Sequence, residues 1–436
     1  MSMTQHFKQK LSAVALGSAI ALASGSASAY NLIKDDGKEL NLDIEIIAGY
    51  FSSEENYPIG SQTKESPAWT EAYAKYGFSG SFDVGNSGSL FGAINAMSTG
   101  TWGDGDAAGF TTGEERHTEI EDLYAGFRTD MFEISLGRQN ISFGDGFIIN
   151  GDALNLGEGF DDYGTSLDNG GAYWLGGRRA FDNTFVLRAG PETGLRSDLF
   201  WLKSDNPGQS SMELAGANLE YTADHGTFGL LHVKGLGVNA NEAAFNGHEG
   251  RDGQTTTSIR YQGNAGVENL FLSSEYTTQE NGVTGADTNA WYAEAGWTFA
   301  DIPWSPSVNY RLTSYDTGYD PLFYGFNRGY GTWFQGEVAA SYAGPFATDS
   351  DIHYFSVTAH PAETLTVGVM YFKYEDTAAN SGDNDADEVD IWAEWVVNEH
   401  LIISPLVGLY TPKSANNTQG NTNTNTYVQV LAIVPF

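Results

Sequence analysis

Four arginines occupy equivalent places in separate stretches of alternating apolar and polar residues. Arg128, Arg188, Arg260 and Arg311 all fall on the polar side of their stretches, although the chain holds only 11 arginines. A guanidinium binds carboxylate or phosphate through paired hydrogen bonds, so arginines in a track, oriented by neighbouring acids, would bind anionic groups. The alternative is a ladder of charges that only solvates a polar wall. The sequence leaves both interpretations open.

An acidic stretch offers ligands for a cation. Asp383, Asp385 and Asp387 place oxygen atoms at alternate positions, as a calcium loop does. The sixth position of such a loop requires glycine, but here it is Glu388. The pattern therefore favours a solvated acidic loop over a loop-bound Ca²⁺ ion, and we expect no cofactor.

The sequence contains no recognisable catalytic arrangement. Seven histidines follow residue 29, and most of them lie in predicted turns or loops. The patterns H-E-x-x-H and G-x-S-x-G are both absent. The chain has no cysteine, which excludes disulfides and thiolate metal sites. We expect that the protein is not an enzyme.

The charged candidates belong to stretches of about ten residues with a two-residue period, which is the signature of a strand with two different faces. In the first stretch Leu40, Leu42 and Ile44 face one way, and Asn41 and Asp43 face the other. Eighteen such strands are predicted, at residues 40–51, 68–84, 90–99, 118–128, 132–138, 181–189, 195–203, 212–222, 227–238, 255–262, 270–278, 289–299, 307–315, 351–359, 365–374, 388–397, 401–410 and 426–436.

This pattern predicts an all-β fold, a transmembrane antiparallel β-barrel of about 18 strands with short periplasmic turns and long extracellular loops. Eight short turns alternate with nine longer loops. Closed barrels and helices are the structures that satisfy every backbone group inside a bilayer. A soluble β-sandwich would show the same alternation locally. Glu133 and Ser135 fall on the polar face of their strand, whereas the alternation would place Arg138 on the apolar face. This departure indicates a β-bulge or the end of a strand.

The polar faces of these strands would line a pore. Acids outnumber bases on them. The inward acids are predicted to be Asp43, Glu45, Glu71, Asp122, Glu133, Glu220, Glu275, Glu294, Asp390 and Glu394, and the inward bases Lys75, Arg128, Arg188, Arg260 and Arg311. The connection at 139–179 holds ten glycines and no sustained period. Long connections in compact proteins are usually functional, so we expect this one to fold into the pore as a constriction. A second long loop is predicted at 316–350.

The first 29 residues have the features of a signal peptide. Lys8 and Lys10 precede an apolar run at 11–23, and residues 27–29 form an A-x-A cleavage site. The barrel domain would then span 30–436. No later stretch approaches the roughly 20 apolar residues of a transmembrane helix. Removing the signal leaves 19 basic and 56 acidic residues, a net charge of −37, which argues against nucleic acid as a partner.

The last strand carries an export signature. Val428, Val430, Ala432, Val434 and Phe436 share one face and end on an aromatic residue. This arrangement resembles the carboxyl-terminal signal that the barrel-insertion machinery of Gram-negative bacteria recognises. We therefore expect insertion into the cell outer membrane, with outer-membrane lipid and that machinery as partners.

Three stretches resemble the alginate-export family of outer-membrane porins. Residues 136–139 (L-G-R-Q) followed by 143–146 (F-G-D-G) are similar to the family's G-R-Q…G-D-G segment. Residues 179–183 (R-A-F-D-N) resemble its R-x-F-D-G turn, with Asn in place of the last Gly, and 387–392 (D-E-V-D-I-W) resemble its E-x-D-L-Y strand start. The resemblance implies a monomeric barrel whose arginine-rich pore passes an anionic polysaccharide, with Arg138 and Arg179 as pore residues. The charge of −37 departs from that picture and places the chain nearer to general porins.

Two functions from different classes follow. The first is a porin for passive diffusion of small hydrophilic or anionic solutes, oligosaccharides among them, with 139–179 as its constriction. The second is a structural or adhesive barrel whose acidic loops bind cations or a partner. Deleting part of the 316–350 loop would, in the second case, abolish binding without changing solute flux.

Overall fold

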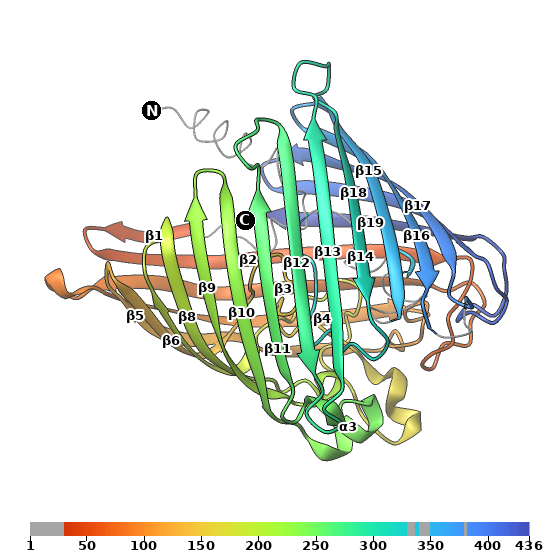
Figure 1. Ribbon diagram of the computed structural model, residues 1–436, viewed down its shortest axis with the longest axis horizontal. Helices are drawn as coiled ribbons and strands as arrows, with labels where there is room; N and C mark the ends of the chain where they lie inside the picture. Colours follow the sequence, from red (N-terminus) through yellow and green to blue (C-terminus); the bar gives the residue numbers. More distant parts are fainter. Residues whose placement is uncertain (1–29, 329–335, 340–348, 379–381, 436) are drawn as a thin grey trace.

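The structure, a computed structural model, describes residues 30–328, 336–339, 349–378 and 382–435. Its main feature is a closed barrel of 18 antiparallel strands, β2 to β19 (Figure 1). Each strand pairs with the next, and β19 pairs with β2 to close the ring. The strands are β2 (Lys38–Ser53), β3 (Ala68–Asp83), β4 (Ser89–Gly103), β5 (Arg116–Arg128), β6 (Phe132–Gln139), β7 (Phe181–Ala189), β8 (Gly194–Lys203), β9 (Glu213–Ala223), β10 (Gly226–Gly237), β11 (Thr255–Gly263), β12 (Leu270–Glu280), β13 (Asp287–Thr298), β14 (Ser307–Tyr315), β15 (Ser350–Ala362), β16 (Leu365–Asp376), β17 (Ala386–Asn398), β18 (Leu401–Pro412) and β19 (Asn425–Pro435).

The two-residue period decides which side chains face outward. On β2, Ile46 and Tyr50 are 38% and 50% exposed, whereas Ile47 and Phe51 are 7% and 0% exposed. Successive side chains of a strand point to opposite faces, so the barrel presents an apolar outer surface and a mixed inner one. All eighteen predicted strands are present, with bounds shifted by at most four residues. The single closed sheet confirms the barrel and excludes the sandwich.

A further strand, β1 (Tyr30–Asp35), was not predicted. It pairs with the first residues of β2, from Tyr30↔Leu42 to Asp35↔Lys38. β19 pairs with the remainder of β2, from Glu45 to Ser53. β1 therefore continues the ladder beyond the end of β19 and lies outside the eighteen-strand ring.

Turns and loops alternate between the two ends of the barrel as the sequence predicted. The eight turns are 84–88, 129–131, 190–193, 224–225, 264–269, 299–306, 363–364 and 399–400. Of the nine loops, 281–286 is as short as a turn, while 140–180 and 316–349 are the longest. The helix α3 (Ala240–Asn246) lies at the loop end. No helix among the described residues is long and apolar enough to cross a membrane.

Register shifts in two ladders bear on the lumen, one between β6 and β7 and one between β4 and β5. The β6–β7 ladder slips between Gly137 and Gln139, where Gly137 has φ +120°. This is the irregularity that the parity of Arg138 predicted. The β4–β5 ladder slips at Glu121, so that Glu121 and Asp122 are both buried. A bulge adds a residue to one strand and redirects its side chain, and here it turns a second carboxylate inward.

Candidate functional site: the lumen

The 140–180 loop folds into the barrel. Asp145, shortly after the end of β6, is 5% exposed. Its carboxylate accepts hydrogen bonds from Gln262 on β11 (2.6 Å), Ser273 on β12 (2.8 Å) and Tyr292 on β13 (3.2 Å). These strands stand four or more places around the ring from β7, where the loop ends. The loop therefore crosses the lumen, as the sequence predicted.

Aromatic contacts hold the loop at two distant parts of the wall. The ring of Phe147 lies 5.2 Å from that of Tyr292. Further along the loop, Trp174 lies 6.0 Å from Phe51 on β2 and 5.4 Å from Tyr427 on β19. Such ring pairs contribute about 0.5–1.5 kcal/mol each beyond the area they bury, so both legs of the loop are fixed.

Inward carboxylates also bind the backbone of the loop. Glu121, at the β5 bulge, accepts the N–H groups of Arg179 (2.7 Å) and Ala180 (2.8 Å). Glu71 on β3 accepts the N–H of Leu175 at 3.0 Å. Buried N–H groups need partners, so these two acids stabilise the loop.

The described part of the 316–349 loop packs against the first loop. The backbone N–H of Asn150 donates to the carbonyl of Phe323 at 2.7 Å. Arg328 donates to Asp145 (2.8 Å) and to Glu294 on β13 (2.6 Å). The Arg328 guanidinium therefore joins both loops to the barrel wall.

A second piece of the same loop is bound on the other side of the barrel. Glu388 on β17 accepts the N–H groups of Val338 and Ala339, each at 2.9 Å. Gly336 donates to the hydroxyl of Tyr374 at 2.7 Å. Glu388 is thus used for loop attachment, and residues 329–335 and 340–348 lie outside the described residues.

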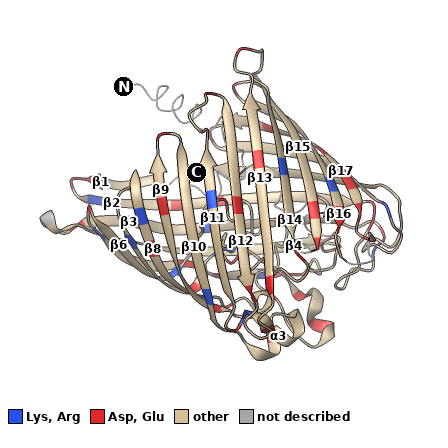
Figure 2. Ribbon diagram, viewed as in Figure 1, with Lys and Arg blue, Asp and Glu red and all other residues tan. Residues whose placement is uncertain are grey.

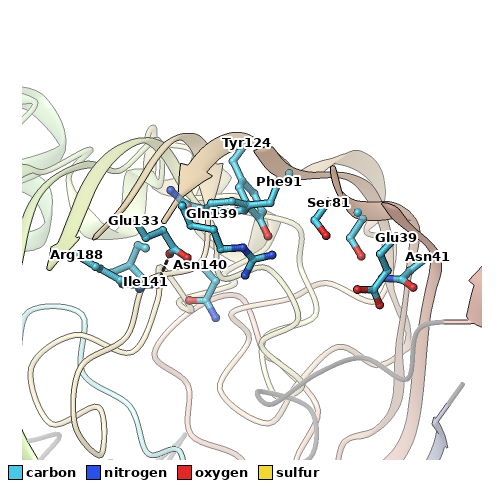
Figure 3. Close-up of a pocket in the computed structure, with 14 residues that line it drawn as sticks. Glu39, Asn41, Ser81, Phe91, Tyr124, Glu133, Gln139, Asn140, Ile141 and Arg188 are labelled. Carbon is cyan, nitrogen blue, oxygen red and sulfur yellow. Dashed lines mark hydrogen bonds and ion pairs between the residues drawn. The ribbon is translucent and has the colours of Figure 1, made fainter. Parts of the chain in front are cut away.

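Two of the predicted arginines border an open space. A cavity of about 370 Å³ lies against β2 to β7, toward the short-turn end (Figure 3). It is lined by Glu39, Asn41, Ser79, Gly80, Ser81, Phe91, Gly92, Tyr124, Arg128, Glu133, Gln139, Asn140, Ile141 and Arg188. Arg188 pairs with Glu133 at 3.1 Å and with Asp198 at 3.5 Å.

Two other predicted arginines are buried in ion pairs. Arg260 donates to Glu220 at 2.6 Å on the neighbouring wall. Arg311 is 1% exposed, lies 3.8 Å from Glu294, and stacks on the ring of Phe326 at 4.9 Å. Phe326 belongs to the second loop, so that loop covers Arg311.

The remaining predicted residues are dispersed over the lumen. Arg138, at the register shift between β6 and β7, pairs with Asp205 (2.7 Å) and Asp182 (3.3 Å). The Nε of Arg179 donates to the carbonyl of Gly176 at 3.1 Å. The others are Asp122, which pairs with Lys75 at 2.5 Å, and Glu394, which is 6% exposed on β17. Of the predicted pore residues Arg128, Arg138, Arg179, Arg188, Arg260, Arg311, Asp122, Glu294 and Glu394, the structure joins Arg311 to Glu294 and brings Arg128 and Arg188 to one cavity.

Charge is spread over the wall, and most of the arginines are paired. Figure 2 shows acidic and basic positions distributed over the strands and the loop end. Eight of the eleven arginines form ion pairs with described acids, and Arg116, Arg128 and Arg179 do not. Ion pairing of this extent supports a charge ladder more than an open arginine track.

Sequence reasoning did not identify the residues that fix the loops. Asp145 stands in F-G-D-G, an acid between two glycines within an apolar segment, and that placement is a usable signal of a buried anchor. Arg251 and Asp320 join the 238–254 loop to the 316–349 loop at 2.7 Å. No local pattern marks this pair, because its members are 69 residues apart.

Titratable groups at the loop end have shifted pKa values. Burial lowers the pKa of His248 to about 4, and the charge of Arg251 adds to the effect. Burial would raise the pKa of Asp320, but the charge and hydrogen bonds of Arg251 outweigh it and lower this pKa. His248 is therefore neutral at pH 7, beside an ion pair.

The acidic stretch and the terminal signals can be located only in part. Asp383 accepts hydrogen bonds from Ser414 and Asn416, and Asp385 accepts the N–H of Asp376. On β19, Val434 and Ala432 lie on the outward face as predicted. The third residue of the insertion signal, Phe436, and the predicted signal peptide at 1–29 lie outside the described residues.

Comparison with known proteins finds likeness of fold. No protein-family model and no curated protein matches the chain. Among solved structures, it is similar to a BenF-like porin from Pseudomonas fluorescens Pf-5 (TM-score 0.59, 10% identity, covering 91% of this chain and 99% of that one). It is also similar to OccAB2 from Acinetobacter baumannii (0.58, 11%, 91% and 98%) and to OpdQ from Pseudomonas aeruginosa (0.55, 14%, 92% and 98%).

These identities show the fold alone, a porin-type barrel. A closed barrel with an apolar outer face suits the bacterial outer membrane, which is the localisation that the sequence predicted. The resemblance to the alginate-export family stays a prediction.

Proposed function

We propose that this chain is an outer-membrane porin through which small hydrophilic solutes diffuse passively, with anionic solutes, saccharides among them, as candidates. The observation that carries the proposal is the 140–180 loop held inside a closed ring by Asp145 and Phe147. A loop fixed across a lumen narrows the passage, and the side chains beside it then select solutes by size and charge.

The charge of the lumen favours a small solute over a long polyanion. Arg138, a pore residue if the alginate-export resemblance holds, is paired with Asp205 and Asp182. Acids that hold an arginine also repel a polyanion that approaches it. The alginate-export resemblance therefore supports the barrel and its orientation better than it supports alginate as the solute.

Planar-bilayer recording of the purified protein tests the proposal. We expect discrete conductance steps, and in a salt gradient a reversal potential of the cation-preferring sign, because the inward acids Asp43, Glu45 and Glu275 form no ion pair with a described base, whereas the inward bases other than Arg128 are all paired. A protein that inserts into the bilayer but gives no steps would exclude a channel. Deleting 317–327 should also change flux, since this segment packs on the first loop; an adhesive barrel would lose binding with its flux unchanged.

A further inference from the structure

The cavity at the short-turn end contains two charged side chains that are not neutralised by described partners. Arg128 donates to the Ser89 hydroxyl at 3.3 Å and lies 4.8 Å above the ring of Phe91, but it forms no ion pair with any described acid. Glu39 also lines the cavity, and its side chain has neither a hydrogen bond nor an ion pair within the described chain. Among the described residues that line it, the cavity therefore has one free cation and one free anion.

A free acceptor lies beside Glu39. The Oδ1 atom of Asn41 is buried and has no hydrogen-bond partner among the described residues. Leaving such an acceptor unsatisfied costs about 1–3 kcal/mol. Figure 3 shows Glu39 and Asn41 together on one side of the cavity, Glu133 and Arg188 on the other, and Phe91 and Tyr124 between them. One side is thus rich in acceptors, and the centre is aromatic.

The strand register gives the distance between the two free charges. Glu39 pairs with Ser81, and Ser81 pairs with Phe91, on the consecutive strands β2, β3 and β4. Phe91 pairs in turn with Gly126 on β5, and Arg128 stands two residues further along that strand. At roughly 4.8 Å per strand and about 3.4 Å per residue, about 16 Å of wall separates the backbone of Arg128 from that of Glu39. The guanidinium leans over Phe91, one strand toward Glu39. This leaves on the order of 10 Å between the two charged groups, which an extended chain of about six carbons can bridge with one hydrogen bond of about 2.9 Å at each end.

We propose that this cavity is a binding site for solutes with an ammonium group at one end and a carboxylate at the other. The ammonium binds Glu39 and Asn41, the carboxylate binds Arg128, and the apolar spacer packs on Phe91 and Tyr124. Glu133 and Arg188 neutralise each other and form a wall without net charge. This inference rests on the proposed channel function and names a solute class for it.

Block of the ion current in planar bilayers tests the site. The probes are ω-aminobutanoate, ω-aminohexanoate and ω-aminooctanoate, compared with hexanoate and hexylamine, which carry one charge each. We expect ω-aminohexanoate to half-block the current at a concentration about tenfold below either singly charged compound, since each added charge-assisted hydrogen bond contributes about one factor of ten. The shorter and longer amino acids should block less well.

Two variants separate the two ends of the site. Glu39→Gln should weaken block by ω-aminohexanoate and hexylamine but not by hexanoate, and Arg128→Gln should weaken block by ω-aminohexanoate and hexanoate but not by hexylamine. Glu363→Gln, in the exposed 363–364 turn, and Arg116→Gln, near the loop end, are matched controls that should behave as wild type. Folding of each variant is checked by heat-modifiable gel mobility, and if one variant fails to fold, the other variant and the chain-length series decide.

The outcomes are distinct from those of the function test. Equal block by all five compounds, or block unchanged in both variants, overturns the site while the channel stands. Absence of any conductance overturns the channel and the site together.

Discussion

Asp145 joins the 140–180 loop to three strands of the opposite wall, and replacing it with asparagine tests its role. Asp145→Asn keeps the size of the side chain and removes its charge. The carboxylate accepts from three neutral donors and from Arg328, and its side chain is 6% exposed. Hydrogen bonds to a charged group are worth about 1.5–3 kcal/mol against about 1 kcal/mol for neutral pairs. Arg328 keeps Glu294, which limits the loss to about 3 kcal/mol in total.

A loss of about 3 kcal/mol raises the undocked population of this part of the loop roughly 100-fold. We expect excursions to a higher conductance level to become more frequent by that factor in single-channel recordings. The heat stability of the barrel should change little, because the strand ladder is untouched. Asp161→Asn, an exposed acid in the same loop, is the matched control. If Asp145→Asn shows the conductance and noise of wild type, the carboxylate is not what holds this part of the loop.

Two other predictions test the outer face and the loop end. Leu123 lies on the outward face of β5 and is 53% exposed, so Leu123→Arg should lower the free energy of unfolding, measured by urea titration in lipid, by about 2–4 kcal/mol. Tyr124→Arg, at the neighbouring inward position, should lower it less. Equal losses in the two variants would contradict the assigned faces. His248, whose pKa burial lowers from 6.5 to about 4, must stay neutral in the packed loops, so local stability should fall by up to about 3 kcal/mol as the pH drops from about 6.5 to about 4. Hydrogen exchange of residues 240–251 should show this loss in wild type and not in His248→Asn, and pH-independent protection of the wild-type loop would refute it.

The barrel was predictable from the sequence because its information is local. Each strand shows its own period, and a shift of one residue would move every apolar side chain to the wrong face. That constraint is strong enough to place all eighteen strands within four residues. β1 was missed because Tyr30, Leu32 and Ile33 are all exposed, so burial imposes no alternation on it.

The interior was predictable only in outline. Length and glycine content indicated that the 140–180 loop enters the lumen, but its partners lie far away in sequence. Asp145 contacts residues 117, 128, 147 and 183 positions away. No period or short motif records contacts of that separation. The two-residue period, in contrast, places Arg128 and Arg188 on the same face of their strands, and both line the cavity.

The loop contacts decide which of the inward charged groups can contribute to ion selectivity. The two-residue period assigns every inward acid to the wall of the solute path. In the structure, however, Glu71, Glu121 and Glu388 each accept backbone N–H groups from a folded-in loop. These three acids are buried, with exposures of 0%, 3% and 0%, so a solute in the lumen does not reach them. The paired arginines are neutralised, so selectivity depends on the few groups left free, such as Arg128 and Glu39, rather than on the net charge of the chain. If substitutions at Glu71 and Glu121 changed the reversal potential more than substitutions at Arg128 and Glu39, this assignment of roles would be wrong.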